Sequence, residues 1–196
     1  MINKEADNGK IFIITGPSGS GKTTLRNILL KDKKLANKFT KSVSLTTRRP
    51  RHKEKNGKDY FFISKAEFTK QKRDKKILEW TKYLGYYYAT PRNFVEAKLR
   101  QGKNVSLCLD LKGALRLKRL YPKKVVAIFI LQPSLETLRK RIEGRCNKTK
   151  RGEIIKRLRL AKKELLFAKD FDYSILNTNL KQAELGLKKI ILKELQ

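Results

Sequence analysis

A glycine-rich segment between a short apolar run and a helical pattern is the feature that most constrains this chain. Ile11–Thr15 is apolar and β-branched, which favours a buried strand. Apolar positions at Leu25, Ile28 and Leu29 follow the segment with helical spacing and predict a helix over 21–33. Strand, glycine-rich loop and helix in this order form the context in which such a loop binds phosphate.

The loop itself, residues 16–23, satisfies the pattern G-x-x-x-x-G-K-[ST]. Its backbone N–H groups and the positive end of the helix dipole would surround phosphate oxygens. We expect Lys22 to contact the β- and γ-phosphates and Thr23 to offer its hydroxyl to Mg²⁺. A chance match is the alternative, and the strand and helix on either side argue against it. The predicted ATP-binding residues of this region are Gly16, Pro17, Ser18, Gly19, Ser20, Gly21, Lys22, Thr23 and Thr24.

Strand and helix patterns alternate at both ends of the chain and predict an α/β fold. Continuous apolar runs at 105–109 and 125–131 are typical of parallel strands that are covered on both faces. We expect a three-layer core with a parallel sheet, made of residues 1–42, 93–136 and 158–196. Further strands are expected at 41–46, 60–63, 77–80, 86–89 and 173–176, and helices at 94–101, 111–120, 134–143, 153–168 and the C-terminus.

The bulk composition points to a cytoplasmic protein. The 196 residues are long enough for one good core, and no apolar run approaches the roughly 18 residues that cross a bilayer. The polar first ten residues do not resemble a signal peptide, so we expect no membrane association. Cys108 and Cys146 form neither a disulfide framework nor a zinc pattern; Cys108 is expected to be buried and Cys146 exposed. His52 lies in a charged run and is expected to be solvated.

The net charge of +31 is the most unusual bulk property. It favours nonspecific binding of nucleic acid at low salt. The alternative is a lysine-biased composition without functional meaning, which agrees better with lysines that are scattered along the whole chain. The sequence leaves a monomer and a dimer equally open.

Between residues 43 and 92 the pattern changes to short strands and aromatic residues, which predicts an inserted β-rich lobe. Arg48 and Arg51 can bind a phosphate dianion, and Tyr60 and Tyr88 can donate hydroxyls to it. Solvated arginines and packed tyrosines are the alternative, and Tyr86 and Tyr87 are expected to be packing residues. Four motifs follow one another in this lobe: SLTTRRPR at 44–51, GKDYFF at 57–62, LEW at 78–80 and YYATPR at 87–92.

Glu79 is an isolated carboxylate in a basic neighbourhood. Guanine presents two adjacent donors, N1–H and the 2-amino group, which one carboxylate can accept together. Adenine presents an acceptor at N1, which the carboxylate would repel, so a buried Glu79 would select guanine. Ser44 and Thr90 could donate to O6 of the base.

These motifs, in this order and spacing, resemble those of the guanylate kinases, and the likeness runs from about residue 10 to the C-terminus. The resemblance implies that ATP and GMP are the substrates. It also implies that Asp110 contacts GMP or holds Mg²⁺ through a water, and that Asn177 lies near the adenine of ATP. The implied GMP-binding residues are Ser44, Arg48, Arg51, Tyr60, Glu79, Tyr88, Thr90 and Asp110.

The same resemblance implies a small helical lid over residues 137–157, whose arginines close over ATP. Arg141, Arg145 and Arg157 are the candidates; arginines on exposed helix faces are the alternative. The nucleophile is an anionic GMP phosphate oxygen, so no general base is needed, and catalysis must come from alignment and charge neutralisation. With Lys22 and the GMP-binding Arg48 and Arg51, the lid arginines complete the predicted catalytic set.

The chain departs from the family pattern at several positions. Cys108 stands where a second acidic residue is usual, Lys112 replaces a glutamine, and Ala89 replaces a glycine. Three other functions compete with this prediction. A kinase for another small molecule would not need Glu79, a protein-binding module would not need an intact phosphate loop, and a nucleic-acid binder would show steep salt dependence without base preference.

Overall fold

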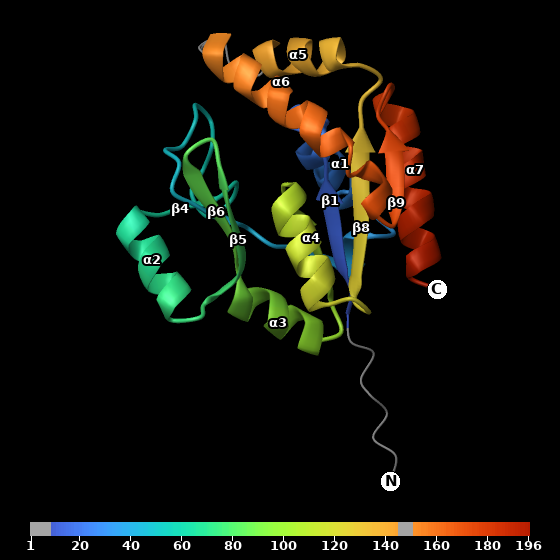
Figure 1. Cartoon of the computed structure of the whole chain (residues 1–196). Coiled ribbons are helices and arrows are strands. Elements are labelled where there is room, and N and C mark those ends of the chain that lie inside the picture. Colours follow the sequence, from blue (N-terminus) through green and yellow to red (C-terminus); the bar gives the residue numbers. More distant parts are fainter. Residues whose placement is uncertain (1–8, 145–150) are drawn as a thin grey trace.

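A five-stranded parallel sheet forms the centre of the computed structural model, which describes residues 9–144 and 151–196 (Figure 1). The strand order is β2-β7-β1-β8-β9, so the first long strand lies in the middle. Parallel pairing brings the carboxyl ends of all strands to one edge, and the glycine-rich loop leaves β1 at that edge. The strands are β1 (Ile11–Thr15), β2 (Phe39–Lys41), β7 (Asn104–Cys108), β8 (Val125–Leu131) and β9 (Tyr173–Leu176).

Helices cover both faces of this sheet, which confirms the predicted three-layer α/β core. On one face, Ile11 and Ile13 of β1 pack with α3 and α4; on the other, Phe12 and Ile14 pack with α1 and α7. Both clusters are almost completely buried, as expected for a strand whose side chains alternate between two apolar layers. The helices of the core are α1 (Lys22–Leu29), α3 (Arg92–Arg100), α4 (Leu111–Leu120) and α7 (Leu180–Glu194).

A second sheet of four strands forms the inserted lobe, to the left of the core in Figure 1. Its order is β4-β3-β6-β5; β3 runs parallel to β4, and β6 is antiparallel to both of its neighbours. The β5–β6 hairpin carries a register shift next to Glu79, a bulge of the kind that re-aims a side chain. The strands are β3 (Leu45–Thr46), β4 (Phe61–Phe62), β5 (Ile77–Tyr83) and β6 (Tyr86–Pro91).

The lobe also contains a helix that no sequence pattern predicted, α2 (Lys65–Arg73). It is capped by Ser64, whose Oγ accepts a hydrogen bond from the backbone N–H of Glu67 at 3.0 Å. Phe68 is its only buried residue and stacks on Tyr87, with ring centres 4.5 Å apart. A single buried residue among nine gives no periodicity to recognise, so pattern analysis could not predict this helix.

Two helices at the top of Figure 1 occupy the predicted lid, α5 (Leu135–Gly144) and α6 (Arg151–Leu165). The expected cap of α5 is confirmed, because Ser134 Oγ accepts a hydrogen bond from the backbone N–H of Thr137 at 3.1 Å. Helix α6 passes through the predicted lid boundary at 157 and continues into the core. Arg145 and Cys146 lie outside the described residues. Two short 3₁₀ helices complete the fold, Ala36–Lys38 and Ala168–Asp170.

Three smaller expectations have mixed outcomes. His52 is exposed, as predicted. Tyr86 is 43% exposed and does not pack, so that expectation was wrong; the residue lies at the tip of the β5–β6 hairpin. Cys108 is only half-buried because it ends β7 at the carboxyl edge, where it faces a pocket. Within residues 9–144 and 151–196, no helix is long and apolar enough to cross a membrane.

Candidate active site

One pocket at the carboxyl edge of the sheet collects side chains from the glycine-rich loop, the lobe, the end of β7 and helix α6. It brings together most of the predicted site residues, which come from segments far apart in the sequence. Those that line it are Gly16, Ser18, Lys22, Thr23, Ser44, Arg48, Arg51, Tyr60, Glu79, Tyr88, Asp110 and Arg157. Six further residues line it without having been predicted: Thr81, Tyr83, Ala89, Cys108, Leu109 and Glu164.

The glycine-rich loop has a backbone that only glycines adopt easily. Gly16 and Gly21 have φ angles of 132° and 96°, and a Cβ at Gly16 would lie 2.5 Å from the carbonyl oxygen of Ile130. The Lys22 ammonium donates hydrogen bonds to the carbonyl oxygens of Gly16 and Pro17, at 2.6 and 2.8 Å. The lysine is therefore held at the mouth of the loop, where a phosphate can take over its donors.

Two amides behind the loop hold its shape. The carbonyl oxygen of Ser20 accepts hydrogen bonds from Gln132 Nε2 at 2.8 Å and from Asn177 Nδ2 at 2.9 Å. Asn177 is 3% exposed and does not line the pocket; Gln132, just after β8, is also buried and does not line it. The position of Asn177 thus supports the loop, and Gln132 was missed because nothing in the sequence connects it to Ser20.

Glu79 lies on β5 at the floor of the lobe side of the pocket and is 3% exposed. Thr90, on the neighbouring strand β6, donates a hydrogen bond from Oγ1 to Glu79 Oε1 at 2.6 Å. Burial raises the pKa of Glu79 to about 7, and the charge of Asp110 adds to this, while the hydrogen bond from Thr90 opposes it. A ligand that donates hydrogen bonds to this carboxyl favours its charged form, and therefore lowers its pKa.

Asp110 caps helix α4 and also reaches the lobe. Its Oδ1 accepts a hydrogen bond from the backbone N–H of Gly113 at 2.9 Å, and its Oδ2 accepts one from Thr81 Oγ1 at 2.7 Å. Each oxygen thus has one protein donor, which fixes the carboxylate and leaves lone pairs toward the pocket.

Gly113 lies between the two carboxylates. A Cβ built on it would lie 2.7 Å from Glu79 Oε2 and 3.3 Å from Asp110 Oδ1. The absence of a side chain therefore lets the first turn of α4 approach both acids. The sequence motif around Asp110 contained this glycine, but only the structure gives it a role.

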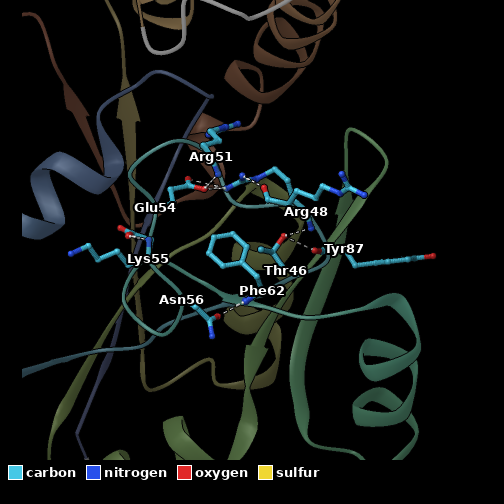
Figure 2. A network of polar contacts seen from close by, with 10 residues as sticks. Thr46, Arg48, Arg51, Glu54, Lys55, Asn56, Phe62 and Tyr87 are labelled. Carbon is cyan, nitrogen blue, oxygen red and sulfur yellow. Dashed lines mark hydrogen bonds and ion pairs between the residues drawn. The ribbon is translucent and has the colours of Figure 1, made fainter.

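Figure 2 shows a polar network that holds Arg48 in the loop after β3. Arg48 Nη2 donates to both carboxylate oxygens of Glu54, at 2.9 and 2.8 Å, and Glu54 Oε2 also accepts from the backbone N–H of Arg51 at 2.8 Å. The guanidinium lies 5.5 Å from the centre of the Tyr60 ring. Glu54 was missed because an acid in a basic loop looks like an ordinary solvated charge.

Helix α6 contributes two residues to the upper wall of the pocket. Arg157 is 8% exposed and donates a hydrogen bond from Nη1 to Ser18 Oγ of the glycine-rich loop at 2.7 Å. Glu164 is buried, which raises its pKa to about 7; the charge of Lys22 opposes this and that of Asp110 adds to it. Arg141 of α5 does not line the pocket and instead donates to the carbonyl oxygen of Asn177 at 3.4 Å.

Comparison with known proteins gives a consistent result. Residues 8–194 match the family model described as guanylate kinase. The chain is 42% identical to the guanylate kinase of Synechocystis sp. over 186 residues, 95% of each chain. It is 41% identical to the guanylate kinase of Mycoplasma mobile over 193 residues, 96% of this chain and 94% of that one. The crystal structure of guanylate kinase from Anaplasma phagocytophilum is also similar, with a TM-score of 0.79 and 32% identity over 95% of this chain and 86% of that one.

Proposed function

Because this chain belongs to the guanylate kinase family and is an ATP:GMP phosphotransferase, we propose that its central pocket binds GMP on the lobe side and the ATP phosphates at the loop after β1. The observation that carries this assignment is that the buried Glu79 of the lobe and Lys22 of the glycine-rich loop line the same pocket. A base-selecting carboxylate and a phosphate-binding loop in one pocket suit a reaction between two nucleotides.

Glu79 selects the base in this proposal. Its carboxylate accepts the N1–H and 2-amino donors of guanine, while Thr90 fixes its orientation from behind. Adenine would leave the buried carboxylate facing an acceptor, which costs free energy in proportion to how completely the group is desolvated. Ser44 lines the same wall and donates to O6. These contacts use the base and not the ribose, so we expect dGMP to be accepted as well.

The phosphate of GMP is held by Arg48, Arg51, Tyr60 and Tyr88, all of which line the pocket. Glu54 holds the Arg48 guanidinium in one orientation before the substrate arrives, which lowers the entropy cost of ordering it. The GMP phosphate then lies between the lobe arginines and the glycine-rich loop, in position for attack on the γ-phosphate of ATP.

The residues present fit a Mg²⁺ ion. Thr23 offers a hydroxyl to the pocket, and Asp110 offers a carboxylate whose two oxygens each already accept one hydrogen bond. Within the described residues there is no cluster of three or more His, Cys, Asp or Glu side chains that could hold a metal. This agrees with Mg²⁺, which keeps several waters and takes one or two protein ligands beside substrate phosphates. We assign Thr23 as a direct ligand and Asp110 as a ligand through water; the ion supplies charge neutralisation on the phosphates.

Transfer needs no general base, since the attacking GMP phosphate oxygen is already anionic. When phosphate binds, the Lys22 ammonium gives up its hydrogen bonds to the loop carbonyl oxygens and donates to phosphate oxygens instead. Arg157 of α6, which already donates a hydrogen bond to Ser18, contributes a second positive charge. Both neutralise charge that spreads over the transferred phosphoryl group. We assign Arg141 and Arg145 to the closed state of the lid, over the ATP phosphates.

The experiment that tests the proposal measures ADP release from ATP and Mg²⁺ with GMP, dGMP, AMP, UMP and dTMP as acceptors. We expect turnover with GMP and dGMP and at most about 1% of that kcat/KM with AMP, because a buried polar group left unsatisfied costs up to about 3 kcal/mol. Equal turnover with AMP would contradict the role of Glu79. Omission of Mg²⁺ with EDTA should abolish turnover, and unchanged turnover would contradict the metal assignment.

A further inference from the structure

Each nitrogen of the Arg157 guanidinium donates a hydrogen bond within the protein. Nη1 donates to Ser18 Oγ at 2.7 Å and Nε to Glu153 Oε1 at 2.9 Å, and Nη2 donates to the same carboxylate oxygen. These contacts use three of the five N–H donors of a guanidinium. Within residues 9–144 and 151–196 the other two have no acceptor, so they are available to a ligand of the pocket that Arg157 lines.

The two partners of this guanidinium lie on different elements. Glu153 is in the first turn of α6, and Arg157 follows four residues later on the same side of the helix. Ser18 belongs to the glycine-rich loop. Because two N–H groups on one edge of the guanidinium converge on Glu153, its plane is fixed and Nη1 is directed at the loop. Helix α6, which runs from the lid down to the core in Figure 1, is therefore connected to the loop through this one side chain.

Burial distinguishes this pair from an ordinary ion pair on a helix surface. Arg139 and Glu143 of α5 have the same two groups at the same spacing, 3.0 Å apart, but the Arg139 side chain is 54% exposed and that of Arg157 only 9%. Water and salt screen an exposed pair, which therefore contributes little. A guanidinium that is shielded from water depends instead on the acceptors that the protein provides. Loss of Glu153 would leave Arg157 with one acceptor and free to turn away from the loop.

We propose, on the basis of the catalytic role assigned to Arg157 above, that Glu153 is a positioning residue for phosphoryl transfer. It holds the Arg157 guanidinium against the glycine-rich loop, where the two remaining N–H donors meet the transferred phosphoryl group. Glu153 does not line the pocket, so it acts only through Arg157 and touches no substrate. An arginine that is already oriented loses less entropy when it binds the phosphoryl group, and the benefit therefore appears in kcat.

Steady-state kinetics of the whole chain with ATP, Mg²⁺ and GMP test this role through two variants and their combination. Glu153→Gln keeps the size of the side chain and removes its charge. It should lower kcat about tenfold, as one weakened charge-assisted contact would, and change the KM for GMP less than about twofold. Arg157→Met should lower kcat by about 10²-fold. In the Arg157→Met background, Glu153→Gln should change kcat by less than about twofold, because the residue through which it acts is gone.

Two acids of α5 provide matched controls. Glu143→Gln removes the partner of the exposed Arg139, and Glu136→Gln removes an acid from the first turn of its helix, the place that Glu153 has in α6. Both should keep kcat within about twofold of the parent chain.

The outcomes separate this proposal from the function on which it rests. An unchanged kcat in Glu153→Gln, an equal fall in the two controls, or a further tenfold fall in the Arg157→Met background would overturn the positioning role alone. The last of these would mean that Glu153 acts on the helix and not through the arginine. An unchanged kcat in Arg157→Met would instead contradict the catalytic role of Arg157 and overturn both assignments. A thermal melt of each variant checks that it is folded at the assay temperature.

Discussion

Thr90 Oγ1 donates a hydrogen bond to Glu79 Oε1 at 2.6 Å, between the two long strands of the lobe. Thr90 is fully buried and Glu79 nearly so, which means that this contact is shielded from water and fixes the carboxylate in one direction. The fixed carboxylate lines the pocket, where the proposed function places the base of the acceptor nucleotide. Under that proposal, the hairpin already holds the base-selecting group in position before any substrate binds.

The change Glu79→Gln should reduce the preference for GMP over AMP by about 100-fold in the ratio of kcat/KM values, because the amide presents a donor as well as an acceptor to the base. Competition assays with both nucleotides measure this ratio directly. Glu184→Gln, on the far helix α7, removes one acid elsewhere and should leave the ratio unchanged. An intact preference in the Glu79 variant would show that other groups select guanine.

The raised pKa of Glu79, about 7, predicts that GMP binding depends on pH. Below this pKa the empty site holds a protonated carboxyl, which must release its proton to accept both guanine donors. The KM for GMP should therefore fall by about tenfold per pH unit as pH rises toward 7 and level off above it. The Glu79→Gln variant is the control, because it keeps the titration of the GMP phosphate. Parallel profiles for the two proteins would contradict the assignment.

The same pKa predicts a change in stability. A carboxyl whose pKa is raised by folding stabilises the native state fully below its unfolded value near 4.5, and this contribution is lost as pH rises through about 7. Urea unfolding between about pH 4.5 and 8 should therefore show a smaller loss of stability with pH in Glu79→Gln than in the parent chain. An identical loss in both would mean that burial does not perturb this group. Glu164, whose pKa is also raised to about 7, titrates in the same range in both proteins.

Local patterns in the sequence predicted the core well. The predicted boundaries are confirmed for β1, α4, β8 and β9. Continuous apolar runs and helical periodicity predict such elements well, because their apolar side chains are buried in the layers of the core. The elements of the lobe were harder to predict from the sequence. α2 buries only Phe68, so its stability comes from one aromatic cluster and a serine cap that periodicity does not register.

The site divides in a similar way. The glycine-rich loop and the motif residues were predictable because their spacing is local. Glu54, Gln132 and Glu164 were not, because each acts through a partner that only folding brings near: Arg48, Ser20 and the pocket wall. A local sequence pattern does not reveal polar groups whose role depends on contacts with residues that are distant in the sequence.

Gly113→Ala should disturb the acceptor site without unfolding the protein. The new methyl group would lie 2.7 Å from Glu79 Oε2, so the carboxylate or the first turn of α4 has to move. We expect the KM for GMP to rise about tenfold, as a displaced contact of roughly 1.4 kcal/mol would cause, with the KM for ATP changed little. Gly186→Ala in α7, where a methyl group meets nothing closer than 3.9 Å, should leave both values unchanged. Equal changes in both KM values would argue for general disruption.

Glu54→Gln should weaken GMP binding through Arg48. The carboxylate accepts two hydrogen bonds from that guanidinium in a half-buried loop, and an amide can accept at only one atom. The loss of a charge-assisted hydrogen bond should raise the KM for GMP by roughly tenfold, with kcat less affected. Glu96→Gln is the matched control, because Glu96 also accepts from an arginine, Arg92, in a part-buried pair, which lies on α3 outside the pocket. A larger effect on kcat than on KM would mean that Arg48 acts mainly in the transition state.

Lys22→Ala should remove turnover with every acceptor, in contrast to the Glu79 variant. Lys22 donates hydrogen bonds to the carbonyl oxygens of Gly16 and Pro17 at the mouth of the loop, and the proposed function has it neutralise charge on the transferred phosphoryl group. Loss of such a charge should lower kcat by about 10³-fold with GMP and dGMP alike. GMP binding, measured by calorimetry without ATP, should stay within about twofold, since the lobe residues are untouched. Lys31→Ala, an exposed residue just after α1, controls for the change in net charge. If Lys22→Ala lost GMP binding together with turnover, the two halves of the pocket would be coupled, and the separate roles of the loop and the lobe would have to be abandoned.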